Sequence, residues 1–183
     1  VTLEEYNQWS SNRQKAFLIN TYNAFTWKLI VTHWPVKSIK DIGTFFKSPS
    51  EQEFFNLLGK KHSLDWIEHE MLRPKFKDER IHFALNCASK GCPPIRREAF
   101  TSERLDAQLD FQVKIFLNNT AENQFLIQER QLKISKIFDW YEDDFLRLSP
   151  SLPAWFALYI PKFNDRLNYD IDYKDYDWTI NGF

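Results

Sequence analysis

The stretch "SNRQKAFLINTYNAFTWKLIVTH", residues Ser11–His33, is the longest helical pattern in the chain and makes a mainly helical fold the first expectation. Pro35 ends the pattern. One apolar stripe of this helix, which we expect to be buried, comprises Phe17, Ala24, Trp27 and Val31. Asn20 and Asn23 lie inside the pattern, although asparagine favours helices poorly because its amide competes for backbone hydrogen bonds. We therefore expect two buried amides that tie down a neighbouring loop.

The middle of the chain combines short strands with further helices. "EFFNLLGKKHSL" is typical of two strands around a Gly59-Lys60 turn. Ser63 is placed to cap a helix over "LDWIEHEML", which should reach Leu72 and end at Pro74. A longer helix is expected over Ser102–Leu117. Its buried stripe comprises Leu105, Leu109, Val113 and Phe116.

The last third adds a hairpin, two helices and an extended tail. "QFLIQERQLKIS" alternates as a hairpin does, and Ser135 is placed to cap a helix through "KIFDWYEDDFLRL". Pro153 suits the first turn of a helix over Ala154–Ile160. The tail "NYDIDYKDYDWTIN" reads as extended. Helices dominate, so we predict an α+β fold that is mainly helical, with a small and mostly antiparallel sheet.

Length and composition narrow the class of protein. The 183 residues contain no linker-like segment or repeat, so we expect one domain over residues 1–183. A net charge of -1 gives no general attraction to nucleic acid, and we expect no nucleic-acid partner. No segment approaches the ~18 continuous apolar residues that span a bilayer, so no membrane span is expected. The chain begins at Val1 rather than Met, and we expect an upstream segment to have been removed.

The segment "RIHFALNCASKGCPPIRR", Arg80–Arg97, holds both cysteines of the chain. As a strand it would place His82 and Asn86 on one face, opposite Cys87. As a helix capped by Asp78, it would again place His82 and Asn86 on a common face. The alternation of apolar residues favours the strand.

Cys87 is the candidate nucleophile, because basic residues surround it in sequence and positive charge lowers the pKa of a thiol. We predict that Cys87 is the more reactive thiol, with a pKa below the ~8.5 of a free thiol. Cys92, between Gly91 and Pro93, suits a structural role in the turn.

His69 and His82 are the candidate bases for such a thiol. Glu68 precedes His69, and Asp65 lies one helical turn before it, so either carboxylate could orient an imidazole. Asn20 or Asn86 could supply an amide near a reacting carbonyl.

Two other arrangements fit the same residue types. A Cys87–Cys92 disulfide would lock a tight turn, a structural role that is common in exported proteins. Metal ligation could in principle use His69, His82, Glu68 and the cysteines, yet the C-x4-C spacing lacks the C-x2-C knuckle of zinc sites. We expect no metal and no cofactor. The chain also lacks phosphate-binding glycine loops and the G-x-S-x-G elbow.

Several blocks, in order, resemble the family called domain of unknown function 547. They are "FLINTYNAFTWKLI", "PVKSIKDIG", "LDWIEHEMLRPKF", "RIHFALNCASKGCPPIRREAF", "ISKIFDWYEDDF" and "YKDYDWTIN". The resemblance covers about residues 16–181 and brings no settled reaction with it. It implies an exported, periplasmic location. It also implies the motif positions Asn20, Asn23, Glu68, His69, His82, Cys87, Cys92 and Pro93.

Two hypotheses follow. In the leading one the protein is a thiol-dependent hydrolase or acyl/peptidyl transferase acting on a peptide or acyl compound. Cys87 is then the nucleophile, His69 or His82 the base, and Glu68 or Asp65 the orienting group. In the other, the protein is a non-catalytic binding module whose cysteine, histidine and asparagine motifs are structural, with a Cys87–Cys92 disulfide.

Overall fold

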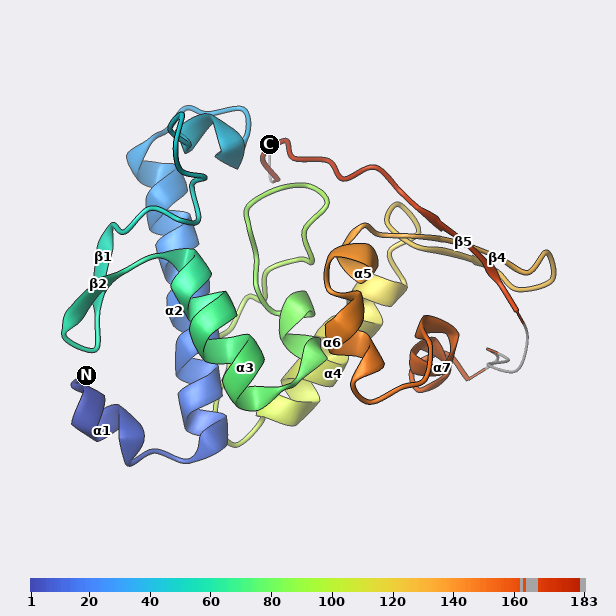
Figure 1. The fold of residues 1–183 in the computed structure, drawn as a ribbon, viewed down its shortest axis with the longest axis horizontal. Coiled ribbons are helices and arrows are strands. Elements are labelled where there is room, and N and C mark those ends of the chain that lie inside the picture. The colour runs from blue at the N-terminus through green and yellow to red at the C-terminus, as the bar shows by residue number, and fades with distance from the viewer. Residues whose placement is uncertain (162, 164–167, 182–183) are drawn as a thin grey trace. The chain divides into compact units, whose positions relative to one another are not determined.

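The computed structural model describes residues 1–161, 163 and 168–181. The fold is α+β and mainly helical with two small sheets, as predicted (Figure 1). The chain forms two compact units, the first comprising Val1–Leu109 with Asp177–Phe183 and the second Asp110–Tyr176. None of the described helices is long and apolar enough to cross a membrane.

The first unit is organised around the long helix α2. Its elements are α1 (Leu3–Asn7), α2 (Ser11–Thr32), η1 (Ile39–Ile42), β1 (Phe55–Leu57), β2 (Lys60–His62), η2 (Trp66–Leu72), α3 (Arg73–Phe76), η3 (Glu79–Phe83) and the start of α4 (Leu105–Leu117). Both α1 and α2 begin at hydroxyl caps, Thr2 in a capping box and Ser10.

Helix α2 occupies the predicted place, but it buries a different face. Its apolar core contacts come from Ala16, Leu18, Ile19, Tyr22, Leu29 and Ile30. The stripe expected to be buried is wrong, because Trp27 is 55% exposed and Val31 is 67% exposed. Both stripes are apolar at helical spacing, so the helix alone does not specify which one faces the core; the partners packed against it decide.

The predicted β1–β2 hairpin is present, with its turn at Leu58-Gly59 rather than at Gly59-Lys60. Phe55 pairs with His62 and Leu57 with Lys60 around a Leu58-Gly59 turn, in which both residues have positive φ. Ser63 caps the following helix through the Trp66 N–H, as predicted.

Pro74 does not end that helix, contrary to the prediction. The segment η2 is π-helical, and the N–H of Arg73 bonds five residues back to the carbonyl of Glu68. The wider turn tolerates a residue that cannot donate an i→i−4 bond, so the helix continues through α3 to Phe76.

The favoured strand at Arg80–Arg97 is also wrong. Asp78 accepts the N–H of Arg80 and begins the short 3₁₀ helix η3 over Glu79–Phe83, after which the chain is irregular. The cap predicted for the helical alternative is therefore present, but one turn replaces the longer helix. Asp78 itself is fixed by side chains from elsewhere in the unit, and this tertiary contact overrides the local apolar alternation.

The second unit packs helices against a three-stranded sheet. Besides the end of α4 it contains β3 (Gln124–Leu126), β4 (Gln131–Ile134), α5 (Ile137–Trp140), α6 (Glu142–Leu146), α7 (Leu152–Ala157) and β5 (Asp170–Tyr173). The predicted hairpin is β3–β4, and part of the extended tail forms β5, which pairs with β4 in parallel. The N-cap of α5 is Lys136 rather than the predicted Ser135, although the hydroxyl of Ser135 accepts the N–H of Ile137, the first residue of α5. The predicted single helix divides into α5 and α6.

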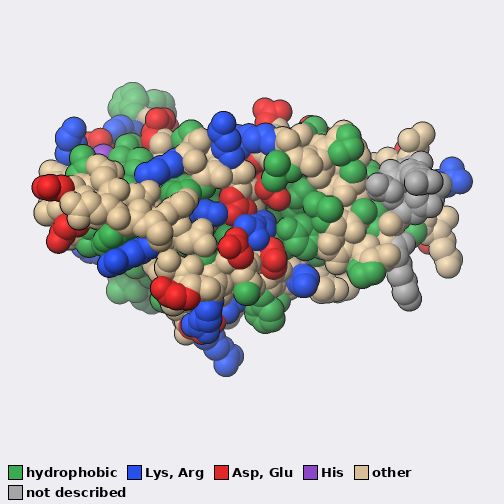
Figure 2. Space-filling model, turned by 90° about the horizontal axis from the view of Figure 1, so that it is seen from below, with side chains coloured by type: hydrophobic (Ala, Val, Ile, Leu, Met, Phe, Trp, Pro, Cys, Tyr) green, Lys and Arg blue, Asp and Glu red, His purple; other side chains and the backbone are tan. Residues whose placement is uncertain are grey.

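Helix α4 confirms its predicted stripe, since Leu105, Leu109, Val113 and Phe116 are fully buried. The predicted helix at Ala154–Ile160 instead spans Leu152–Ala157, with Pro153 in its first turn. On the face shown in Figure 2, acidic and basic side chains are interspersed rather than segregated. This mixture agrees with the net charge of -1.

Candidate functional site

Asn23 on α2 holds the segment that leads into the cysteine loop, residues Cys87–Cys92. Its Nδ2 donates to the carbonyl of Ala84 at 2.8 Å, and its Oδ1 accepts the N–H of Asn86 at 2.8 Å. The amide thus satisfies one backbone acceptor and one donor of a buried, irregular segment. This is the loop-holding role that the sequence predicted for Asn23.

Asn20, one turn earlier on α2, makes the same reciprocal contact with a second segment. Its Nδ2 donates to the carbonyl of Phe100 at 2.8 Å, and its Oδ1 accepts the N–H of Phe100 at 2.9 Å. The two asparagines therefore fix the chain on both sides of the cysteine loop, whereas a single loop had been expected.

Asn86 closes the base of the cysteine loop. Its Nδ2 donates to the carbonyl of Pro93 at 2.8 Å, and its Oδ1 accepts the N–H of Ala88 at 2.9 Å. Ala88 has a positive φ of 61°, a conformation that a non-glycine residue adopts rarely. The side chain of Asn86 stabilises this bend by bonding both limbs of the loop.

Cys87 and Cys92 form a disulfide, the second of the arrangements that the sequence allows. The N–H of Cys87 donates to the sulfur of Cys92 at 2.8 Å, and the Ser89 hydroxyl lies 2.8 Å from the sulfur of Cys87. Cys92 is buried and Cys87 is half-buried. In the bridged form neither sulfur is a thiolate, so neither is a nucleophile.

The C-terminal segment Asp177–Asn181 runs against the cysteine loop. The N–H groups of Lys90 and Gly91 donate to the carbonyls of Thr179 and Asp177, at 2.8 and 3.0 Å. Asn181 donates two hydrogen bonds to the loop, from its N–H to the carbonyl of Ala88 and from its Nδ2 to the carbonyl of Ser89. The extended character of this segment was predicted, but its partner was not, because strand pairing across 90 residues leaves no local signal.

Glu68 and His82 are brought together from η2 and η3. Nδ1 of His82 lies 4.0 Å from Oε1 of Glu68, and the two residues are 3% and 6% exposed, respectively. A carboxylate held this close to the imidazole in the interior can orient the ring. Of the predicted histidine–carboxylate combinations, the structure assembles this one in the interior.

His69 lies next to Glu68 in sequence but is exposed. Its Nδ1 accepts a hydrogen bond from Arg73 at 3.0 Å. Burial raises the pKa of Asp65, while a hydrogen bond with Ser50 and the nearby His69 oppose this effect. The predicted neighbourhood of Asp65 and His69 is present, and His69 is exposed whereas Glu68 is buried.

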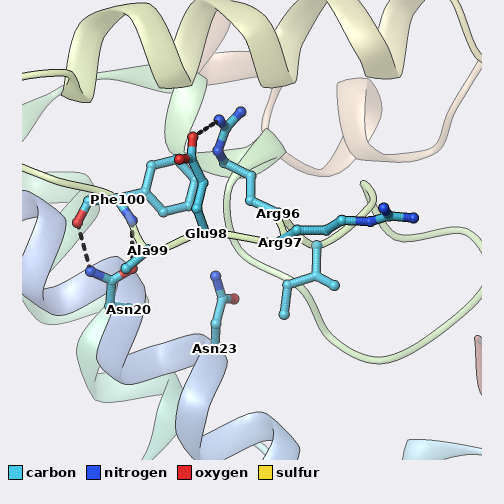
Figure 3. A pocket seen from close by; sticks show the side chains of 8 residues that line it. Asn20, Asn23, Arg96, Arg97, Glu98, Ala99 and Phe100 are labelled. Carbon is cyan, nitrogen blue, oxygen red and sulfur yellow. Dashed lines mark hydrogen bonds and ion pairs between the residues drawn. The ribbon is translucent and has the colours of Figure 1, made fainter.

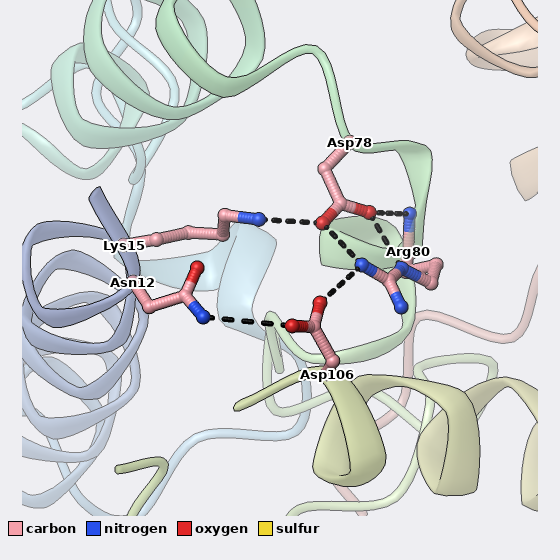
Figure 4. Close-up of polar contacts among 5 residues, drawn as sticks. All are labelled: Asn12, Lys15, Asp78, Arg80 and Asp106. Carbon is pink, nitrogen blue, oxygen red and sulfur yellow. Dashed lines mark hydrogen bonds and ion pairs between the residues drawn. The ribbon is translucent and has the colours of Figure 1, made fainter. Parts of the chain in front are cut away.

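An ionic network, buried at Lys15 and Asp78 and exposed at Asp106, positions η3 against α2 and the first turn of α4 (Figure 4). Nζ of Lys15 lies 2.6 Å from Asp78, and Arg80 makes bonds of 2.8 Å to both Asp78 and Asp106. Burial alone would raise the pKa of Asp78, but the hydrogen bonds and charges of Arg80 and Lys15 outweigh it and lower this pKa. Apart from the Asp78 cap, the sequence did not indicate this network, because its members lie far apart along the chain.

A pocket of about 330 Å³ opens between α2 and the segment after the cysteine loop (Figure 3). Its lining residues are Asn20, Asn23, Ile95, Arg96, Arg97, Glu98, Ala99 and Phe100. In Figure 3 both asparagines project from α2 toward this segment, while Arg97 extends away from them.

The single carboxylate in the pocket lining is engaged by basic side chains. Glu98 bonds Arg96 at 2.5 Å and Arg104 at 3.2 Å. Arg96 first, then the amide of Gln108 and the charge of Arg104, hold the pKa of Glu98 below its usual range. The sequence indicates Arg96 and Arg97 only as basic residues after the cysteines and does not predict the pocket.

Among the described residues, no group of three or more histidine, cysteine, aspartate or glutamate side chains is placed to hold a metal ion. The family model described as "Protein of unknown function, DUF547" matches residues 6–117. The chain therefore belongs to the DUF547 family, as its sequence blocks suggested, although the blocks "ISKIFDWYEDDF" and "YKDYDWTIN" lie beyond the matched residues. Neither a curated protein nor a solved structure is detectably similar to the chain.

Proposed function

We propose that the first unit is a non-catalytic binding module whose motif residues build and hold the pocket beside α2. The observation that carries this proposal is the Cys87–Cys92 disulfide. A bridged pair constrains the loop and lacks the thiolate that covalent catalysis requires.

The asparagines support the same function. The side-chain amides of Asn20, Asn23 and Asn86 each bond one backbone donor and one backbone acceptor. An amide engaged at both ends is suited to holding a wall in place rather than to stabilising a reacting carbonyl. The rigid walls that result favour binding, because less ordering entropy is lost when a ligand binds.

A thiol-dependent hydrolase or acyl/peptidyl transferase is the second candidate function. The buried pairing of His82 with Glu68 favours it, because a base oriented by a carboxylate is one part of such a site. In this case the disulfide is a resting form: exchange with an external dithiol, which is itself oxidised to a disulfide, releases Cys87 as the nucleophile and Cys92 as a second thiol.

The two functions differ in whether His82 activates Cys87. The experiment is alkylation of the reduced protein with iodoacetamide across pH 5–9, read by peptide mass spectrometry. A Cys92→Ser background isolates Cys87. The variants are His82→Asn and, as the matched control, His69→Asn at the exposed histidine.

For a binding module we expect the unreduced protein to remain unlabelled. After reduction, the pH profile of Cys87 should be the same with and without His82. Labelling of Cys87 below pH 7 that is lost in His82→Asn, but not in His69→Asn, would instead establish an activated thiol. Circular dichroism of each variant separates this outcome from unfolding.

A further inference from the structure

The outer face of α2 is apolar and uncovered. Trp27 is 55% exposed and Val31 is 67% exposed, while Ala24 between them and the pocket is also exposed. The opposite face of the helix already supplies the core with Leu18, Ile19 and Leu29. An apolar helix face that its own unit leaves in solvent marks an interaction surface.

This face continues the pocket. Asn20, Ala24, Trp27 and Val31 are spaced i, i+4, i+7 and i+11, so they share one side of the helix. Asn20 lines the pocket, and Ile95, which is 39% exposed, lines it from the opposite segment. From Asn20 to Val31 the distance along the axis is about 16 Å, at ~1.5 Å per residue, or three helical turns. We call these four residues with Ile95 the docking face.

The charges around the docking face are mainly positive. Helix α2 contains Arg13, Lys15 and Lys28 and no acidic residue. Lys15 is occupied by Asp78 in the interior, whereas Lys28 is exposed beside Trp27. The segment across the pocket adds Arg96 and Arg97, and its carboxylate, Glu98, is engaged by Arg96 and Arg104.

We propose that the docking face binds an acidic amphipathic helix of a partner protein, about three turns long, with one apolar side chain seated in the pocket. Ala24, Trp27 and Val31, at i, i+3 and i+7, match the spacing with which a second helix packs its own apolar stripe. The surplus of cations calls for carboxylates on the flanks of the partner helix. The pocket gives the contact a recess for an anchor residue, which a flat lipid surface would not fill. This inference rests on the proposed binding function and specifies its partner.

The test begins with a library of random 16-residue peptides displayed on phage and selected against the whole chain. We expect enriched sequences with apolar residues at i, i+3 or i+4 spacing and an excess of Asp and Glu. Enrichment of basic or non-periodic sequences would overturn the proposal, as would no enrichment at all.

The enriched peptide, synthesised with a fluorescent label, is then titrated against variants by anisotropy. Trp27→Ser with Val31→Ser should weaken binding by about tenfold or more, as for the loss of central interface residues. Leu148→Ser with Leu158→Ser, two exposed apolar positions in the second unit, is the matched control and should change the affinity less than twofold. Arg97→Glu should weaken binding of the acidic peptide and strengthen binding of a peptide in which Glu is replaced by Lys.

The same variants identify the other occupants. A dimer in sedimentation velocity that disappears in Trp27→Ser with Val31→Ser would assign the docking face to a second copy of the chain. Loss of binding to vesicles of phosphatidylcholine and phosphatidylglycerol in that variant would assign it to a membrane. Either result overturns the proposal. If Arg97→Glu abolishes peptide binding but Trp27→Ser with Val31→Ser does not, the pocket is a binding site and the docking face is not. The proposed binding function is tested separately by the alkylation of Cys87, in which labelling below pH 7 that depends on His82 would reject it.

Discussion

Around Phe138 the second unit packs rings on rings, whereas the first unit buries charges and amides beside its aliphatic core. Phe138 contacts Phe145, Trp155 and Phe156 at centroid distances of 5.0–5.8 Å, and all four are fully shielded from solvent. The interior of the first unit contains buried polar side chains, namely Lys15, Asn23, Glu68, Asp78, His82 and Asn86.

The two interiors differ in what the burial of their side chains requires. Burying a polar group costs free energy unless its partners are in place, so such groups are informative where they occur. In the first unit they hold the irregular segments on both sides of the cysteine loop. The rings of the second unit need no such pairing and account for packing alone. The family match over residues 6–117 covers nearly all of the first unit and little of the second.

The largest effect is expected at the centre of the ring cluster. Phe138→Ala removes a fully buried ring and should lower the free energy of unfolding by about 3–5 kcal/mol. Urea denaturation gives this value, and hydrogen exchange read by mass spectrometry locates the change. Exchange should rise first in peptides from Asp110–Tyr176. A uniform rise over the whole chain would show that the two regions unfold as one.

The second prediction concerns the ionic network. Asp78→Ala leaves Lys15 buried without its carboxylate and should cost about 3 kcal/mol, near the lower end for breaking a buried pair. The matched control is Asp106→Ala, since the side chain of Asp106 is 63% exposed and its ion pair is worth little. Equal losses of unfolding free energy for the two variants, in the same urea titrations, would contradict the assignment of the Lys15–Asp78 pair to the interior.

These two regions also differ in how well the sequence predicts them. The α4 stripe and the β3–β4 hairpin follow from periodicity, because local spacing and burial coincide there. The roles of Asn20 and Asn23 follow from two poor helix formers inside a strong helical pattern. The buried face of α2 does not follow, since two apolar stripes compete and only the packed partners choose. Nor does the irregular segment after η3, which Asp78, Asn23 and the tail Asp177–Asn181 hold through contacts remote in sequence.

A third and smaller effect distinguishes the two asparagines. Asn23→Ala leaves the N–H of Asn86 and the carbonyl of Ala84 without this amide in a buried place, at a cost of about 2 kcal/mol. Asn20→Ala should cost less, about 1 kcal/mol, because Asn20 and its bonds to Phe100 are only partly buried. Thermal unfolding ranks the pair. A reversed order would mean that the segment at Phe100, rather than the one at Ala84, limits the stability of the site.

The smallest effect is a dependence on acid that belongs to the first unit. The pKa of Asp78 is lowered in the folded protein by Arg80 and Lys15 against the opposing effect of burial. A group whose pKa is lower in the folded state stabilises the fold above its unfolded pKa of ~3.9 and loses that contribution as the pH falls through the folded value. The slope from this one group is at most ~1.4 kcal/mol per pH unit.

The measurement compares wild type with Asp78→Asn, which keeps the shape of the side chain and removes its charge, by urea unfolding between pH 7 and pH 2.5. The difference between the two proteins should be constant from pH 7 to about pH 5. Below about pH 4 it should shrink, because Asp78 takes up a proton first in the unfolded wild type, which favours unfolding. Other carboxylates with a lowered pKa, such as Glu98 and Asp177, are exposed and titrate in both proteins, so they cancel in the comparison. A difference in unfolding free energy that stays constant, or grows, toward pH 2.5 would mean that Lys15 and Arg80 do not hold Asp78 in its charged form. Ion pairing would then not be a feature that distinguishes the interior of the first unit from the aromatic interior of the second.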